Sequence, residues 1–83
     1  MPLYSVKTKL SPEKAIQKAI DFFGEGGLGL EADAAEENAC CAYFEGGGGH
    51  VRATAYAEAG KTVVDLETRE WDRQVKQFMN EIA

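Results

Sequence analysis

Two glycine-containing stretches have the residue spacing of phosphate-binding loops. The stretch from Gly24 to Gly29 fits the pattern G-x-G-x-x-G. A dinucleotide site needs these glycines between a strand and the amino end of a helix, where backbone N–H groups meet the phosphates. Here the glycines follow an expected helix, so a phosphate would meet the negative carboxyl end of that helix and Glu25. The pattern therefore indicates a helix-to-strand loop.

The second stretch, Gly60-Lys61-Thr62, has the ending of a P-loop. Ala55 stands where that motif requires its first glycine, and the residues after Thr62 are expected to form a strand, not a helix. We therefore expect a tight hairpin turn at Gly60. Neither stretch predicts a nucleotide cofactor, and we expect no cofactor of any kind.

Cys40, Cys41 and His50 are the residues best suited to metal binding or nucleophilic chemistry. A structural zinc site needs four ligands, and the chain has two cysteines and one histidine. On the expected hairpin Cys41 and His50 lie four positions apart, or roughly 13 Å, which exceeds hydrogen-bond reach. Neighbouring carboxylates would also raise the pKa of a thiol. We therefore expect no metal site and no catalytic residue.

The two cysteines also bear on the compartment. Adjacent residues of a strand point to opposite faces, and a disulfide between them would distort the backbone, so we expect free thiols. The amino terminus lacks the features of a secretory signal, and no stretch reaches the ~20 apolar residues of a membrane span. These observations predict a cytoplasmic protein without a membrane partner.

Two helices are expected from apolar residues at three- and four-residue spacing. The first has a serine N-cap at Ser11, a proline at its first position and a C-cap at Gly24. The second begins near Thr68 and runs to the end of the chain, with Trp71 and Phe78 on its apolar face. Both helices are amphipathic, so each must pack on another layer.

Five strands are expected from alternating apolar and polar residues, at 3–10, 28–34, 38–45, 50–58 and 61–68. Four glycines, Gly46 to Gly49, separate the third strand from the fourth. We expect them to form a mobile loop, and the alternative is a loop that closes over a partner.

The two hairpins can be aligned by centring them on Gly47–Gly48 and on Ala59–Gly60. The predicted inner pairs are Phe44–Val51, Ala42–Ala53, Cys40–Ala55, Ala55–Val64 and Ala53–Leu66. The predicted outer pairs are Glu45–His50, Tyr43–Arg52, Cys41–Thr54, Ala39–Tyr56, Glu58–Lys61, Tyr56–Val63, Thr54–Asp65 and Arg52–Glu67. Apolar residues meet apolar residues and opposite charges meet twice, so we expect this register.

These elements predict a single α+β domain over residues 1–83. It is a two-layer sandwich of order β-α-β-β-β-β-α, with a mostly antiparallel sheet and both helices on one face. The pattern does not place the first strand within the sheet. The arrangement is similar to the TATA-binding-protein-like and helix-grip folds, and this resemblance concerns architecture alone.

Charge excludes one class of partner and divides the chain into blocks. The net charge of −5 argues against a nucleic-acid binder, which needs clustered lysines and arginines. Residues 1–18 hold four lysines and one acid, whereas residues 19–51 hold seven acids and no lysine or arginine. We expect the acidic block to form a solvated surface, with a basic partner as the alternative.

The outer sheet face carries the candidate site, because both helices are expected on the other side. The side chains expected to face water there are Tyr43, Arg52, Tyr56, Thr54, Cys41 and Val63. Tyrosine and arginine are enriched in the parts of protein interfaces that contribute most to binding. We expect either an ordinary half-polar face, held by a Tyr43–Arg52 stack and an Arg52–Glu67 pair, or a docking surface.

Two functions follow from these expectations. The first is a small non-catalytic module that binds a protein partner, or a second copy of itself, through the open sheet face. The second is a small-molecule-binding protein, or less readily a thiol enzyme, with a pocket between sheet and helices near Cys40, Trp71 and Phe78.

Overall fold

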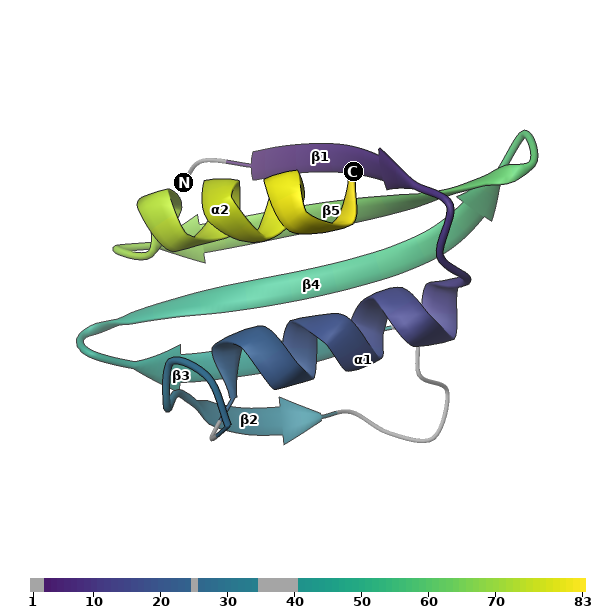
Figure 1. Ribbon diagram of the computed structural model, residues 1–83. Coiled ribbons are helices and arrows are strands. Elements are labelled where there is room, and N and C mark those ends of the chain that lie inside the picture. The colour runs from purple at the N-terminus through teal and green to yellow at the C-terminus, as the bar shows by residue number, and fades with distance from the viewer. Residues whose placement is uncertain (1–2, 25, 35–40) are drawn as a thin grey trace.

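The computed structural model describes residues 3–24, 26–34 and 41–83, and these form one sheet with two helices (Figure 1). The elements in chain order are β1 (Leu3–Thr8), α1 (Pro12–Phe23), β2 (Glu31–Ala34), β3 (Cys41–Gly46), β4 (Gly49–Glu58), β5 (Lys61–Arg69) and α2 (Asp72–Ile82). The predicted α+β class and the order of its elements are confirmed.

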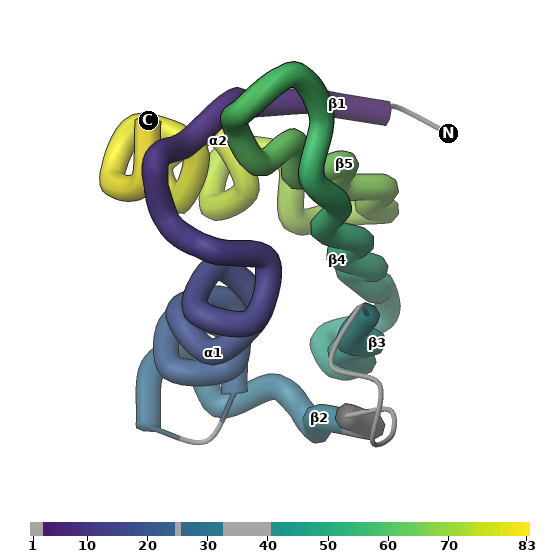
Figure 2. Tube along the Cα trace, turned by 90° about the vertical axis from the view of Figure 1, so that its right-hand side faces the viewer, coloured from purple at the N-terminus to yellow at the C-terminus, as the bar shows by residue number. Residues whose placement is uncertain are grey.

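The sheet has the strand order β1-β5-β4-β3-β2, and every pair of neighbours is antiparallel. The first strand, which the sequence could not place, is an edge strand beside β5. Figure 2 views the molecule along the layers and shows both helices on the same side of the sheet. The other side of the sheet is covered by no helix of the described residues.

Helix α1 begins and ends where the sequence predicts. The Ser11 hydroxyl accepts a hydrogen bond from the backbone N–H of Lys14 at 3.2 Å, and Pro12 is the first helical residue. Gly24 closes the helix by donating its N–H to the carbonyl of Ile20 at 2.9 Å. The buried residues of α1 form one stripe that faces β3, β4 and β5.

Both hairpins have the predicted register wherever the residues are described. Tyr43 pairs with Arg52, Ala53 pairs with Leu66, and Glu58 pairs with Lys61. The other predicted pairs within residues 41–67 agree as well. The predicted pairs Cys40–Ala55 and Ala39–Tyr56 lie outside the described residues.

The four-glycine stretch forms a two-residue turn, so the loop is shorter than the expected four residues. Gly46 and Gly49 pair across the β3–β4 ladder, and only Gly47 and Gly48 form the turn. Both turn residues have positive φ angles, +61° and +82°, the backbone of a two-residue turn that matches the twist of the strands.

The predicted start of the second helix is wrong by one turn. Thr68 has the residue type of an N-cap, but it lies in β5 and pairs with Val51. Its hydroxyl donates to the carbonyl of His50 at 2.9 Å, so the sheet uses the group that a helix start would need. The helix starts at Asp72 and has Trp71 at the N-cap position, without a side-chain cap.

The second strand is shorter than predicted and begins at Glu31 instead of residue 28. Leu28 lies in the turn before it and is exposed. Its N–H donates to the carbonyl of Phe22, and the N–H of Leu30 donates to the carbonyl of Phe23. These hydrogen bonds to the end of α1 hold residues 26–30 outside the sheet, so β2 begins only at Glu31.

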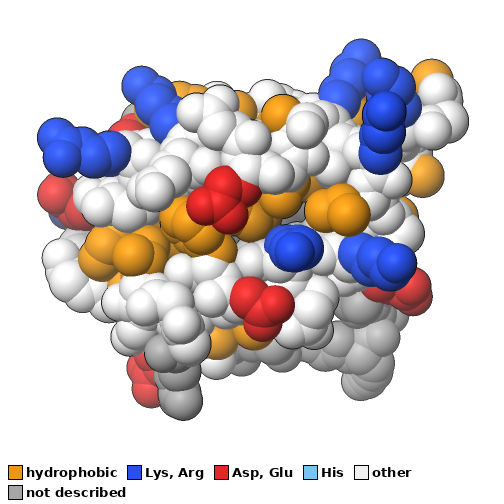
Figure 3. All heavy atoms as spheres, viewed as in Figure 1, with side chains coloured by type: hydrophobic (Ala, Val, Ile, Leu, Met, Phe, Trp, Pro, Cys, Tyr) orange, Lys and Arg blue, Asp and Glu red, His pale blue; other side chains and the backbone are white. Residues whose placement is uncertain are grey.

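The core lies between the helices and the sheet. The inward side chains of β3, β4 and β5, including Val51, Ala53 and Leu66, pack with Ile20 and Trp71 in one cluster, as predicted. Small alanines on the sheet let the helices approach closely. Figure 3 views the helix side of the molecule and shows apolar side chains along the line between α1 and α2.

Candidate functional site

The open face of the sheet carries the five predicted site residues. Arg52 and Tyr56 are exposed, and Tyr43, Thr54 and Cys41 are half-buried. The ladder places Tyr43 opposite Arg52 and Cys41 opposite Thr54, so residues of β3 and β4 lie side by side on this face. Tyr56 lies farther along β4, with 42% of its surface exposed.

Tyr43 is the centre of a row of ring and charge contacts. The imidazole of His50 stacks on its ring, with centroids 5.7 Å apart and planes inclined by 23°. The Arg52 guanidinium lies 5.7 Å from the same ring centroid. Arg52 also reaches Glu67 on β5, with Nη1 and Oε1 3.8 Å apart. The stack and the ion pair expected for this face are therefore both present.

Asp65 holds a second polar group on the same face. Its carboxylate accepts a hydrogen bond from the Ser5 hydroxyl at 2.8 Å and another from the Tyr56 hydroxyl at 3.3 Å. Desolvation of the phenol raises the pKa of Tyr56 above its usual value, and the neighbouring charges of Asp65 and Glu58 add to this. Tyr56 therefore presents a neutral hydroxyl at physiological pH.

Val63 does not face water, contrary to the sequence-based expectation. By its position in the strand its side chain lies on the open face of the sheet, but only 5% of its surface is exposed. It lies on β5 between Tyr56 of β4 and Lys7 of β1. Because β1 occupies the position beside β5, Val63 lies on an inner strand with long neighbours on both sides. The placement of β1 accounts for the error.

The expectation of free thiols is wrong for Cys41, which forms a disulfide bond. It therefore offers no thiolate for nucleophilic chemistry in this state. Its neighbour Cys40 lies outside the described residues. His50 pairs with Glu45 in the ladder, as predicted, and not with Cys41. Within residues 3–24, 26–34 and 41–83, no group of three His, Cys, Asp or Glu side chains could hold a metal ion.

The pocket expected near Cys40, Trp71 and Phe78 is not found in that form among the described residues. Phe78 is buried in the core, and the Trp71 indole N–H donates to the carbonyl of Gly46 at 3.0 Å. Cys40 lies outside the described residues.

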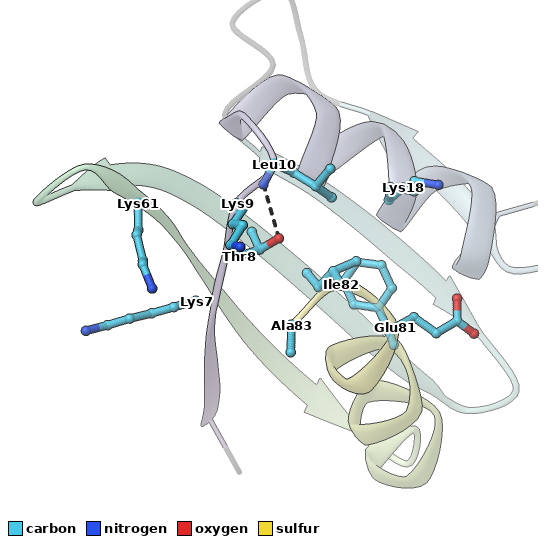
Figure 4. A pocket seen from close by; sticks show the side chains of 10 residues that line it. Lys7, Thr8, Lys9, Leu10, Lys18, Lys61, Glu81, Ile82 and Ala83 are labelled. Carbon is cyan, nitrogen blue, oxygen red and sulfur yellow. Dashed lines mark hydrogen bonds between the residues drawn. The ribbon is translucent and has the colours of Figure 1, made fainter.

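A cavity of about 480 Å³ lies elsewhere, where β1 ends and α1 begins, next to the carboxyl end of α2 (Figure 4). It is lined by Lys7, Thr8, Lys9, Leu10, Lys18, Lys61, Phe78, Glu81, Ile82 and Ala83. Sequence reasoning missed this cavity because its walls come from four elements and one connecting segment. The only feature of the sequence that pointed to this cavity was the excess of lysine in residues 1–18.

Comparisons with known proteins add nothing to this geometry: no family model, curated protein or solved structure matches the chain. Neither α1 nor α2 is long and apolar enough to cross a membrane.

Proposed function

We propose that the chain is a small, non-catalytic interaction module that binds a protein through the open face of its sheet. The partner is another protein or a second copy of this chain. The observation that carries the proposal is the row His50–Tyr43–Arg52, which lies on the face that the two helices leave uncovered. Tyr56 extends this row toward the far end of β4.

The contacts within the row prepare it for binding. Ring stacking and the Arg52–Glu67 pair hold Tyr43 and Arg52 in one arrangement, so a partner would immobilise few additional rotamers. Side-chain ordering costs about 0.5–1.5 kcal/mol per flexible side chain on binding, and a pre-ordered surface avoids part of that cost. The half-buried tyrosine offers a flat apolar area and a polar edge, as interface tyrosines do.

Light scattering coupled to size-exclusion chromatography tests self-association. A dimer of the 9.0 kDa chain would have about twice its mass. Arg52→Glu and Tyr56→Ala should both shift such a dimer to the monomer, and Arg73→Glu on the outer surface of α2 should not. A dimer that persists in the first two variants would contradict self-association through this face.

A photoreactive phenylalanine analogue at position 56 tests a heterologous partner in cells. We expect one crosslinked species of defined mass that Arg52→Glu in the same chain removes. The same analogue at position 73 is the matched control on the helix side and should give no such species. A monomer that yields no crosslink from position 56 in the cell of origin would end the proposal.

A small-molecule-binding protein is the second candidate, and the 480 Å³ cavity favours it because binding pockets commonly have 300–1,000 Å³. The thiol-enzyme version of this candidate is set aside, since Cys41 is disulfide-bonded. The expected cytoplasmic location was based partly on free thiols, and the disulfide at Cys41 removes that argument. Cell fractionation would test the location.

A further inference from the structure

We propose that the cavity at the end of β1 binds a small organic anion, with its charged group on Lys9 and Lys18 and its apolar part on Leu10. This goes beyond the interaction module, because the cavity and the His50–Tyr43–Arg52 row share no residue.

The first ground is the concentration of positive charge. Four of the chain's nine lysines and arginines line this one cavity, and Glu81 is the single acid among the described lining residues. The chain as a whole carries a net charge of −5. A concave surface lined by one sign of charge focuses the field and raises the local concentration of the opposite ion. The ion favoured here is an anion.

The second ground is the placement of Lys9 and Lys18 on either side of Leu10. Lys9 follows the end of β1, and Lys18 projects from α1 on the other side of Leu10 (Figure 4). Lys7 pairs with Val63, so Lys7 and Lys61 are diagonal neighbours on the open face of the sheet, across β1 from Ile82.

The third ground is that Lys9 and Lys18 form no salt bridge with a carboxylate of the described residues. Across residues 3–24, 26–34 and 41–83 the salt bridge within 4.0 Å is Arg52–Glu67, on another part of the surface. The four lysine side chains are exposed and can turn toward a ligand.

The floor of the cavity decides the kind of anion. Phe78 and Ile82 of α2 are buried, and Leu10 is half-buried. Inorganic phosphate would leave the accessible part of Leu10 wet, whereas an aromatic or aliphatic group would cover it. The ligand class is therefore a carboxylate or phosphate attached to an apolar ring or chain. The two head groups share this chemistry and are separated by the test.

The test is an NMR titration of the ¹⁵N-labelled chain with phenyl phosphate and with benzoate. We expect amide shifts confined to residues 8–10, 18, 61 and 78–83. If phenyl phosphate binds more tightly than benzoate the preferred head group is a phosphate, and in the opposite case it is a carboxylate. Inorganic phosphate should bind at least about tenfold more weakly, benzyl alcohol should bind as weakly, and benzylamine should not bind. Added salt should weaken binding of both anions.

Variants separate a site from a generally charged surface. Lys9→Gln with Lys18→Gln should weaken the better probe by about tenfold, since exposed ion pairs contribute a few-fold each. Lys14→Gln with Arg73→Gln removes the same charge from helix positions outside the cavity and should change affinity less than twofold. Glu81→Gln should strengthen binding, which gives a readout in the opposite direction that loss of folding cannot imitate.

Three results would overturn the proposal. The first is no saturable shift with either aromatic anion, and the second is an equal loss of affinity in the lysine pair and its control. The third is that the protein sediments with phosphatidylglycerol vesicles while its amide signals do not shift with phenyl phosphate or benzoate. That result would assign the lysines to a membrane surface. None of these results bears on binding through the open face, which Tyr56→Ala and Arg52→Glu test separately.

Discussion

At the scale of single residues, Tyr4 links the first strand to the last helix. Its hydroxyl donates to the Asp72 carboxylate at 2.7 Å, and Lys76 lies 5.6 Å from the centre of its ring. The hydrogen bond to Asp72 raises the pKa of Tyr4, and desolvation and the charge of Asp72 add to the effect. The folded chain therefore holds the Tyr4 and Tyr56 protons more tightly than the unfolded chain does.

This difference fixes the sign of a pH effect. The stabilising contribution is complete below about pH 10, the ordinary tyrosine value, and is lost as pH rises through the raised pKa values. Asp72→Asn should return the pKa of Tyr4 toward its usual value and leave Tyr56 unchanged. Asp65→Asn should do the reverse. The ¹³Cζ shifts of the tyrosines measure both, and an unmoved Tyr4 titration in Asp72→Asn would contradict the assignment.

Ala59 carries backbone strain at the second hairpin. Its φ angle is +53°, a left-handed conformation that costs a non-glycine residue about 1–2 kcal/mol. Ala59→Gly should remove this strain, and the added freedom of the unfolded chain should offset part of the gain. We expect a net stabilisation of about 0.5–1 kcal/mol in urea unfolding followed by circular dichroism. Lower stability than the parent would show that the turn is not strained.

At the scale of elements, the β3–β4 hairpin and the β5–α2 junction are fitted to one another at Gly49. A Cβ atom on Gly49 would lie 2.0 Å from the carbonyl oxygen of Arg69 and 2.6 Å from the Cβ of Glu70. Glu70 itself has a φ angle of +76°, which turns the chain from strand to helix. The close approach of two backbones therefore sets where β5 stops and α2 starts.

Two alanine substitutions should separate this contact from turn conformation. Gly49→Ala must move one backbone away from the other, and we expect a loss of about 2–3 kcal/mol in the free energy of unfolding. Gly48 has a φ angle of +82° but open space around its Cα, so Gly48→Ala should cost only about 1 kcal/mol. Equal losses in urea unfolding would show that the Gly49 contact does not constrain the fold.

The sequence predicts those elements whose signals are local. Ser11, Pro12 and Gly24 mark both ends of α1, and charge and apolar matching across the glycine turns gives the register of β3, β4 and β5. The start of α2 could not be read from residue types, because Thr68 uses its hydroxyl in the sheet. Thr68 fits both the end of a strand and the start of a helix, so the local pattern does not show which element contains it.

At the scale of the whole molecule, the parts that sequence reasoning missed depend on contacts between distant segments. The position of β1 beside β5 joins the first and last strands, and it explains why Val63 is buried. The lysine-lined cavity likewise needs β1, α1, β5 and α2 together. Tyr43, Arg52, Tyr56, Thr54 and Cys41 have the predicted register because they lie on two consecutive hairpins, although the function of that face stays a prediction.

The core of this small chain depends on a cluster of phenylalanines. The Phe23 ring lies 4.9 Å from Phe22, 5.4 Å from Phe44 and 5.3 Å from Phe78, which joins both helices to the sheet. Phe23→Ala should cost about 3–5 kcal/mol. The total stability expected for 83 residues is only about 4–8 kcal/mol.

We therefore expect Phe23→Ala to be largely unfolded in mild denaturant at 37 °C, and the loss of amide signal dispersion in NMR spectra would reveal it. Leu3→Ala is the control, because Leu3 is 68% exposed on the edge strand and its loss should change stability by less than about 0.5 kcal/mol. A native-like spectrum of Phe23→Ala would mean that the helices are held by other contacts.

The position of Trp71 gives the protein a built-in optical reporter. Its indole donates to Gly46 of the hairpin, and its ring lies so near Gly47 that an added Cβ would be 2.9 Å from Cζ2. The chain contains one tryptophan, so all indole emission comes from this junction. Separation of α2 from the hairpin tip would wet the indole and shift its emission to longer wavelength, while light from the rest of the molecule would not obscure the change. Stopped-flow fluorescence could thus time the docking of the last helix without any attached dye.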